Sequence, residues 1–334
     1  MHQRGDNRMV ATRLDPAESR YPASLLSRSI EPFLPELRER IRFLVETAVA
    51  NQSTISVSEL RSLMPENRFP NDGVLKQFLV TDERLSRLVA EIKGELTLRG
   101  REGLANDRIA QRLRAHDRLS QADDFLRSLG KMCPWIELAG ISGSTAYAGA
   151  KPEDDIDFFL VTAPRRLWIS LLLAMTTARI RRIRSRNSPI LCFNRLVERN
   201  NCIRTFRESR EPLLAREALN LVVLRGNRLY RRLLASAPWM GTVFPEMFAR
   251  RLPEAYEEDE PGRGRRLALG SLANAAAFLF LAPYLWMGGT VRNVRLQRAG
   301  RDRERFRTVV RPELYATESI VYEELREKYR KAFA

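Results

Sequence analysis

The spacing of apolar residues in the first third of the chain predicts three helices followed by a β-hairpin. Residues 1–22 are polar and are expected to form a flexible N-terminus. Ile30 to Ala50 has the period of an amphipathic helix, and two shorter helical stretches follow, SVSELRSLM and NDGVLKQFL. Two strand-like runs then flank Lys93-Gly94, a pair suited to a tight turn. This order over residues 23–102 predicts a winged-helix-like domain.

Residues 103–253 read as a second unit in which helices and strands are mixed. A charged helical stretch comes first, and its expected core contacts are Leu104, Ile109, Leu113, Phe125 and Leu129. Three strands are predicted at WIELAGI, DIDFFLVT and SPILCFNRLVE, with a long helix starting at APRRLW between the last two. EPLLAREALNLVVL and NRLYRRLLASAPWM read as further helices. The predicted fold class is α/β (α+β).

Residues 254–334 are expected to form a helical C-terminal region. It opens with an acidic linker, EAYEEDEP, and closes with the amphipathic stretch ESIVYEELREKYRKAF. Between them, residues 267–291 carry no charge and are long enough to span a bilayer. Because Pro283 interrupts this segment, a helical hairpin, buried or at a membrane surface, is an equal alternative. Membrane association through residues 267–291 therefore stays open.

Composition and charge leave several kinds of binding partner open. The net charge of +16 comes from 57 Lys and Arg against 41 Asp and Glu, which leaves phosphate, nucleic acid and anionic membranes open as partners. Nucleic acid is not favoured, because the second and third predicted helices carry Asp72, Asp82 and Glu83. Three cysteines and two histidines show no metal-ligand spacing. No secretory signal opens the chain, so a cytoplasmic location is expected, with or without contact to the cytoplasmic membrane.

The stretch GSTAYAGAKPEDDIDFFLVT carries the strongest chemical signal. Asp155 and Asp157 are two residues apart, so a strand projects both to one face, where their charges repel. A divalent cation neutralises such a pair in phosphoryl-transfer sites. Upstream, Gly143 allows close backbone approach and Ser144 can donate to phosphate. Together these residues suit Mg²⁺ and the triphosphate of a nucleotide.

Gly-Ser, a spacer of ten and Asp-hydrophobic-Asp-hydrophobic resembles the signature of the nucleotidyltransferase superfamily typified by DNA polymerase beta. From Ser56 to Glu246 the chain is also similar to uncharacterised prokaryotic nucleotidyltransferase-domain proteins. The resemblance implies a polymerase-beta-like mixed sheet with helices. It places Mg²⁺ on Asp155 and Asp157, and the phosphates of an NTP, with ATP the first expectation, on Gly143 and Ser144. The product would be a nucleoside monophosphate joined to an unknown hydroxyl acceptor, and Lys151 is a further candidate ligand of the nucleotide.

One part of the family pattern is missing. The family places a third carboxylate on a later strand, but ILCFNRLV has Asn194 at its centre and no acidic residue. Glu198 at the end of that strand is the first candidate for the role. The alternatives are that Glu217 reaches in from AREA or that catalysis has been lost.

Three functions remain in competition at this stage. The first is a Mg²⁺-dependent nucleotidyltransferase. The second is a catalytically degenerate binding or scaffold protein of the same fold, associated with a membrane through residues 267–291. The third is a winged-helix regulator that binds nucleic acid.

Overall fold

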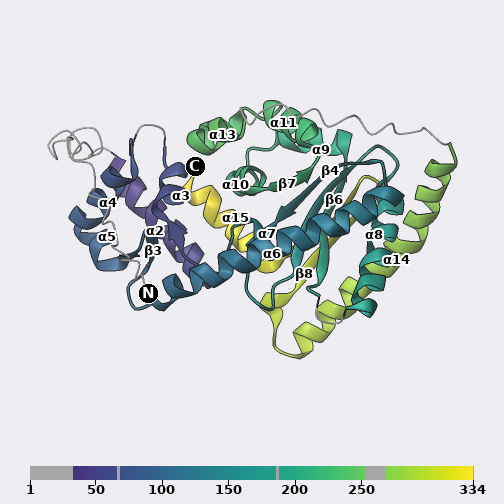
Figure 1. Ribbon diagram of the computed structural model, residues 1–334, viewed down its shortest axis with the longest axis horizontal. Helices are drawn as coiled ribbons and strands as arrows, with labels where there is room; N and C mark the ends of the chain where they lie inside the picture. The colour runs from purple at the N-terminus through teal and green to yellow at the C-terminus, as the bar shows by residue number, and fades with distance from the viewer. Residues whose placement is uncertain (1–32, 66–67, 186–187, 253–267, 334) are drawn as a thin grey trace, which may run out of the picture.

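The computed structural model describes residues 33–65, 68–185, 188–252 and 268–333. The expected flexible N-terminus at residues 1–22 and the acidic stretch at residues 254–261 lie outside them. The described residues form a mixed α/β structure with two separate sheets, which agrees with the predicted class (Figure 1).

The predicted N-terminal helices and hairpin are present. The elements are α2 (Leu34–Ala50), β1 (Ile55–Ser56), α3 (Val57–Ser62), α4 (Asp72–Thr81), α5 (Glu83–Leu88), β2 (Val89–Ile92) and β3 (Glu95–Leu98), with the strands in the order β1-β3-β2. The side chains of Ser56 and Asn71 accept backbone hydrogen bonds at the starts of α3 and α4. Lys93 and Gly94 both have positive φ, as the two-residue turn between β2 and β3 requires.

The second sheet has six strands in the order β7-β4-β5-β6-β9-β8. Its strands are β4 (Ile136–Ser142), β5 (Ile156–Thr162), β6 (Leu191–Glu198), β7 (Val222–Arg225), β8 (Phe306–Arg311) and β9 (Leu314–Ser319). Only β5 and β6 pair in parallel among the described strands, and α8 (Leu167–Arg184) connects them. Strands β4, β5 and β6 are the three strands that the sequence predicts.

Two parts of this sheet differ from the prediction. The helix expected over residues 211–224 ends at Asn220, and the following Val222–Arg225 is strand β7, paired with β4. The C-terminal region is helical, as expected, but its hairpin β8–β9 extends the sheet beside β6. Strands β7 and β9 each pair with a strand far along the chain, so their residues carried no signal strong enough to identify them locally.

Helices cover both faces of the sheet (Figure 1). One face packs on α6 (Gly103–Met132), α8 and α14 (Ala268–Arg298) through residues such as Phe158 and Leu160. Phe159 and Val161 of the same strand face the other layer. That layer contains α9 (Arg199–Glu208), α10 (Pro212–Asn220), α11 (Asn227–Ala235), α12 (Trp239–Val243), α13 (Pro245–Arg251) and α15 (Ile320–Ala332).

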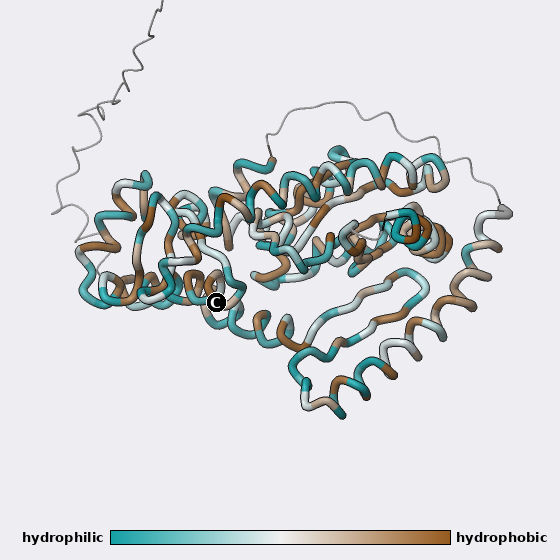
Figure 2. Tube along the Cα trace, turned by 60° about the horizontal axis from the view of Figure 1, so that its bottom comes forward, coloured by the Kyte–Doolittle hydropathy of each residue, from teal (hydrophilic) through white to brown (hydrophobic). Residues whose placement is uncertain are grey.

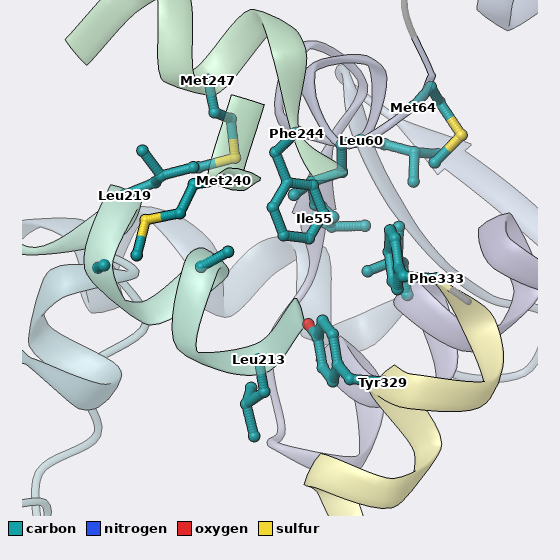
Figure 3. Close-up of a cluster of buried hydrophobic side chains, with 14 of the residues drawn as sticks. Ile55, Leu60, Met64, Leu213, Leu219, Met240, Phe244, Met247, Tyr329 and Phe333 are labelled. Carbon is teal, nitrogen blue, oxygen red and sulfur yellow. The ribbon is translucent and has the colours of Figure 1, made fainter. Parts of the chain in front are cut away.

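The second layer shares one hydrophobic core with the N-terminal elements (Figure 3). Ile55 and Leu60 come from the first 60 residues, Phe244 precedes α13, and Tyr329 and Phe333 come from the C-terminal end. The rings of Tyr329 and Phe333 stack at 5.4 Å, and Phe333 meets Phe244 edge-on at 5.0 Å. The N-terminal elements are therefore joined to the rest by close packing.

The long helices exclude two of the expected core contacts and one of the two alternatives for residues 267–291. In α6, Ile109 and Leu113 are 67% and 65% exposed, whereas Arg108 and Arg118 are buried. In α14 the helix continues through Pro283, so residues 267–291 contain no hairpin turn in their described part.

Candidate functional site

Gly143 and Asp157 lie against each other where β4 ends and β5 begins. Ser142 pairs with Asp157 across the two strands, and Gly143 starts the short helix α7 (Gly143–Ala146). Gly143 has φ +65°, and a Cβ at this position would overlap the carboxylate of Asp157. Glycine is thus required both for its backbone conformation and for the space that Asp157 occupies. The structure therefore brings the predicted Gly-Ser bend and the second aspartate into contact.

An open cleft of about 1320 Å³ begins at the two aspartates. Asp155, Asp157 and Ser144 line it together with Asp154 and Asn194. Its arginines come from the C-terminal part of α8 and from α14: Arg179, Arg181, Arg182 and Arg292. Glu153 and Glu304 line the cleft as well. A cleft lined by both carboxylates and arginines matches a polyphosphate carrying a metal ion.

The charge of Asp157 is held at a cost in free energy. Burial, reinforced by the charges of Asp155, Glu217 and Asp154, raises the pKa of Asp157 to about 7. Burial also raises the pKa of Asp155, and Arg118 opposes that shift. A bound cation would favour the charged forms of both groups.

Asn194 is fixed beside Asp157 by hydrogen bonds on both sides of its amide. Its Nδ2 donates to Asp157 Oδ1, and its Oδ1 accepts from Thr317 Oγ1 at 3.2 Å and from Cys192 Sγ at 3.0 Å. The amide donates to the carboxylate and lacks a negative charge of its own. Asn194 therefore orients Asp157 and supplies no third carboxylate.

The structure does not bring Glu198 to this site. Asp157 pairs with Cys192 near the start of β6, whereas Glu198 pairs with Thr162 at the opposite end of the same two strands. Six residues of strand, roughly 20 Å, separate Cys192 from Glu198. Glu198 instead accepts a hydrogen bond from the backbone N–H of Arg165 at 2.6 Å. The expectation for Glu198 was wrong because the spacing of residues along β6 gives their face but not their distance from Asp157.

Glu217 of α10 lies near the Gly-Ser bend. It accepts a hydrogen bond from Tyr147 Oη at 3.0 Å, and burial raises the pKa of Glu217. Glu217 lines a second pocket of about 290 Å³ together with Gly143, Ser144 and Lys151. Ser144 lines this pocket and the larger cleft. Glu217, unlike Glu198, therefore lies near the Gly-Ser bend.

Lys151 lies in a loop, residues 147–152, that α6 holds through its arginines. The guanidinium of Arg108 donates to the carbonyls of Tyr147 and Ala148, and Arg114 donates to that of Ala150. Arg118 donates to the carbonyls of Lys151 and Pro152 at 2.5 and 3.1 Å.

The sequence analysis missed these arginines. The available signal was the helical spacing of Arg108 and Arg118 with Gln111 and Ala115, which recur every three or four positions and form a buried face. An apolar stripe is the usual sign of a buried helix face, so a buried face that includes arginines was not predicted.

Asp155 and Asp157 are the residues suited to hold Mg²⁺. Among the described residues, no group of three or more His, Cys, Asp or Glu side chains is placed to hold a metal. Mg²⁺ usually keeps several waters and uses one or two carboxylates together with substrate phosphates. The aspartate pair beside an arginine-lined cleft fits that mode of binding.

Comparison with protein-family models, curated proteins and solved structures found no match to this chain.

Proposed function

We propose that this protein is a Mg²⁺-dependent nucleotidyltransferase that moves a nucleoside monophosphate from an NTP, with ATP as the first candidate, to a hydroxyl acceptor. The observation that carries the proposal is the contact between Gly143 and Asp157 at the end of the arginine-lined cleft. It joins the phosphate-binding bend to the aspartate pair in one place. The expected polymerase-beta-like sheet and winged-helix-like N-terminal domain are part of the same proposal.

Each residue of the site has a separate role in this proposal. Asp155 and Asp157 hold the metal ion, which when bound offsets charge on the phosphates during transfer. Ser144 donates to a phosphate oxygen. Arg182 and Arg292, both lining the cleft, attract and orient the triphosphate. Lys151 lines the smaller pocket and binds the nucleotide where that pocket meets the cleft at Ser144.

Glu217 is the group that we assign to accept the proton of the attacking hydroxyl. Its raised pKa, caused by burial, makes it a better base than an ordinary glutamate. Tyr147 fixes one oxygen of Glu217 by its hydrogen bond. The acceptor would then enter through the smaller pocket and the NTP through the cleft, with Ser144 between them.

ATP binding with and without Mg²⁺ tests the site assignment. The variant is Asp155→Asn with Asp157→Asn, and its matched control is Asp123→Asn with Asp124→Asn, two exposed carboxylates on α6. We expect Mg²⁺-dependent binding to weaken at least ~10-fold in the site variant and to persist in the control. Equal binding in both variants would remove the assignment.

A second candidate function is nucleotide binding without transfer. Asn194 favours it, because this residue stands beside Asp157 without adding a negative charge. Pyrophosphate release would be measured with sugars, hydroxy amino acids and RNA ends as acceptors. Release that disappears in Glu217→Gln supports the enzyme, whereas tight Mg²⁺–ATP binding with no release for any acceptor supports the binding protein.

A further inference from the structure

Helix α14 presents a continuous apolar surface to solvent. Its large apolar side chains with exposures from 42% to 72% are Leu272, Leu279, Phe280, Tyr284, Trp286, Met287, Val291 and Val294. At 1.5 Å per residue, the surface from Leu272 to Val294 is about 33 Å long. Figure 2 shows α14 at the edge of the molecule, with hydrophobic positions recurring along it. A surface of this length marks an interaction site.

The opposite side of α14 is attached to the protein near both ends. Near the start, Asn274 Oδ1 accepts from the backbone N–H groups of Trp168 and Ile169 at 2.8 and 3.2 Å. Near the end, Asn293 exchanges two hydrogen bonds with the backbone of Phe306, at 2.6 and 3.0 Å. Between them, Leu281 is buried.

A close contact adds to this attachment. A Cβ on Gly289 would lie 2.6 Å from Thr308 Oγ1, so the helix backbone lies tightly against β8. Because α14 is attached near both ends, with Leu281 buried between them, it cannot cross a bilayer without leaving the sheet. Its length and composition satisfy the requirements for a span, but only its outer side is available to lipid.

The charges around the C-terminal end of α14 identify the occupant. Arg295, Arg298 and Arg303 are exposed there, together with Arg301, which pairs with Glu304. Arg295 and Arg301 line a groove of about 580 Å³ whose apolar lining includes Met287 and Leu296. Trp286 and Tyr284 are the residue types enriched at membrane interfaces. A second copy of this chain would bring the same arginines together, whereas anionic lipid headgroups neutralise them.

We propose that α14 lies in the plane of an anionic membrane surface, with Phe280, Trp286 and Met287 inserted at the boundary between headgroups and acyl chains. The arginines that follow contact the headgroup phosphates. Tyr284 and Arg292 of this helix also line the aspartate cleft. The inference does not depend on the proposed reaction, because vesicle binding is measured without nucleotide.

Co-sedimentation of the full chain with vesicles tests the proposal. The vesicles contain either phosphatidylcholine alone or phosphatidylcholine with 30% phosphatidylglycerol, an amount on the order of that in anionic membranes. We expect binding to the anionic vesicles that is at least ~10-fold tighter than to the neutral ones and that weakens in 0.5 M NaCl, roughly the range in which charges are screened.

Phe280→Gln with Met287→Gln should reduce binding by at least ~10-fold. The matched control is Ile109→Gln with Leu113→Gln, since these two residues are similarly exposed on another helix. Because both pairs are exposed, circular dichroism should show the same folded content in each variant. Equal binding by the two variants, or no binding by the unaltered chain, would overturn the proposal.

Quenching by brominated lipids tests the orientation. Trp168 and Trp239 are buried and Trp135 is half-buried, whereas Trp286 is 61% exposed, so Trp286→Gln should remove most of the quenching. Bromine near the headgroup should quench more than bromine near the chain ends. Stronger quenching from deep positions would indicate a span and contradict the in-plane arrangement. A dimer in solution that Phe280→Gln with Met287→Gln dissociates, without vesicle binding, would show that a second copy is the occupant.

Discussion

At the scale of single residues, the site depends on a glycine that makes room for a carboxylate. Gly143 has positive φ and no space for a side chain beside Asp157, whereas Gly100 has φ +82° with open space around it. Substitutions at the two glycines therefore distinguish the effect of backbone strain from the effect of displacing Asp157.

Gly143→Ala should destabilise the protein by roughly 1–3 kcal/mol and abolish Mg²⁺-dependent ATP binding, because the new methyl group displaces Asp157. Gly100→Ala should cost a similar backbone strain but leave binding intact. Thermal unfolding and ATP titration measure the two effects. Unimpaired binding in Gly143→Ala would show that Asp157 does not need its observed position.

Asp157 makes the metal-free protein sensitive to pH. Its pKa of about 7 in the folded state lies above its ordinary value of 3.8, so the folded protein retains a proton that the unfolded chain has lost. The stability from this group is present in full below pH 4 and is lost as the pH rises through 7.

Asp157→Asn should therefore stabilise the protein in EDTA at pH 8 by about 2 kcal/mol, and by much less at pH 5. Urea unfolding at the two pH values measures this difference. Adding Mg²⁺ and ATP should stabilise only the unaltered chain. A variant that is less stable than the unaltered chain at pH 8 would contradict the assigned electrostatic cost.

At the scale of secondary-structure elements, α6 connects the N-terminal sheet to the loop that carries Lys151. Arg108 contacts Glu95 of β3 at 3.6 Å and also donates to carbonyls of the loop. Arg118 holds the loop further along. The buried polar side of α6 is thus explained by the backbone carbonyls that its arginines satisfy.

Arg118→Gln should increase amide exchange in residues 147–155 by about tenfold and lower stability by roughly 1–3 kcal/mol, since two carbonyls lose their donor. Arg127→Gln on the same helix removes an exposed arginine paired with Asp123 and Asp124, and serves as the control. Hydrogen exchange detected by mass spectrometry measures both. Unchanged exchange in the loop would show that Arg118 does not hold it.

The sequence predicted those elements whose residues repeat in a clear local pattern. The central strands, the hairpin at Lys93-Gly94 and the proximity of Gly143 to Asp157 fall in this group. The short strand β7 and the hairpin β8–β9 did not, because their stability comes from partners far along the chain. The preference for Glu198 over Glu217 was wrong for the same reason: strand register and helix docking decide which of them approaches the site.

At the scale of the whole molecule, the N-terminal elements and α15 complete a common core. Phe333 contacts Phe43 of α2 and Phe244 in addition to Tyr329. Arg40 of α2 also lies over the ring of Phe333 at 4.4 Å. The N-terminal helices are therefore stabilised by residues almost 300 positions away.

Phe333→Ala should destabilise the protein by about 3 kcal/mol and lower the protection of α2 amides from exchange. Val321→Ala, at a half-exposed position of α15, should change neither by more than about 0.5 kcal/mol. Urea unfolding and hydrogen exchange provide the measurements. Retained protection of α2 in Phe333→Ala would show that the N-terminal elements are stable without this contact.

The shared core also sets the timing of folding during synthesis. A ribosome that has completed β3 must still add about 230 residues before Phe333 exists, which takes roughly 10–50 s at ordinary elongation rates. Until then the apolar side chains of α2 that face Phe333 and Tyr329 lack their partners. The nascent chain consequently carries an incomplete apolar surface for most of its translation, and this surface is a natural binding site for chaperones.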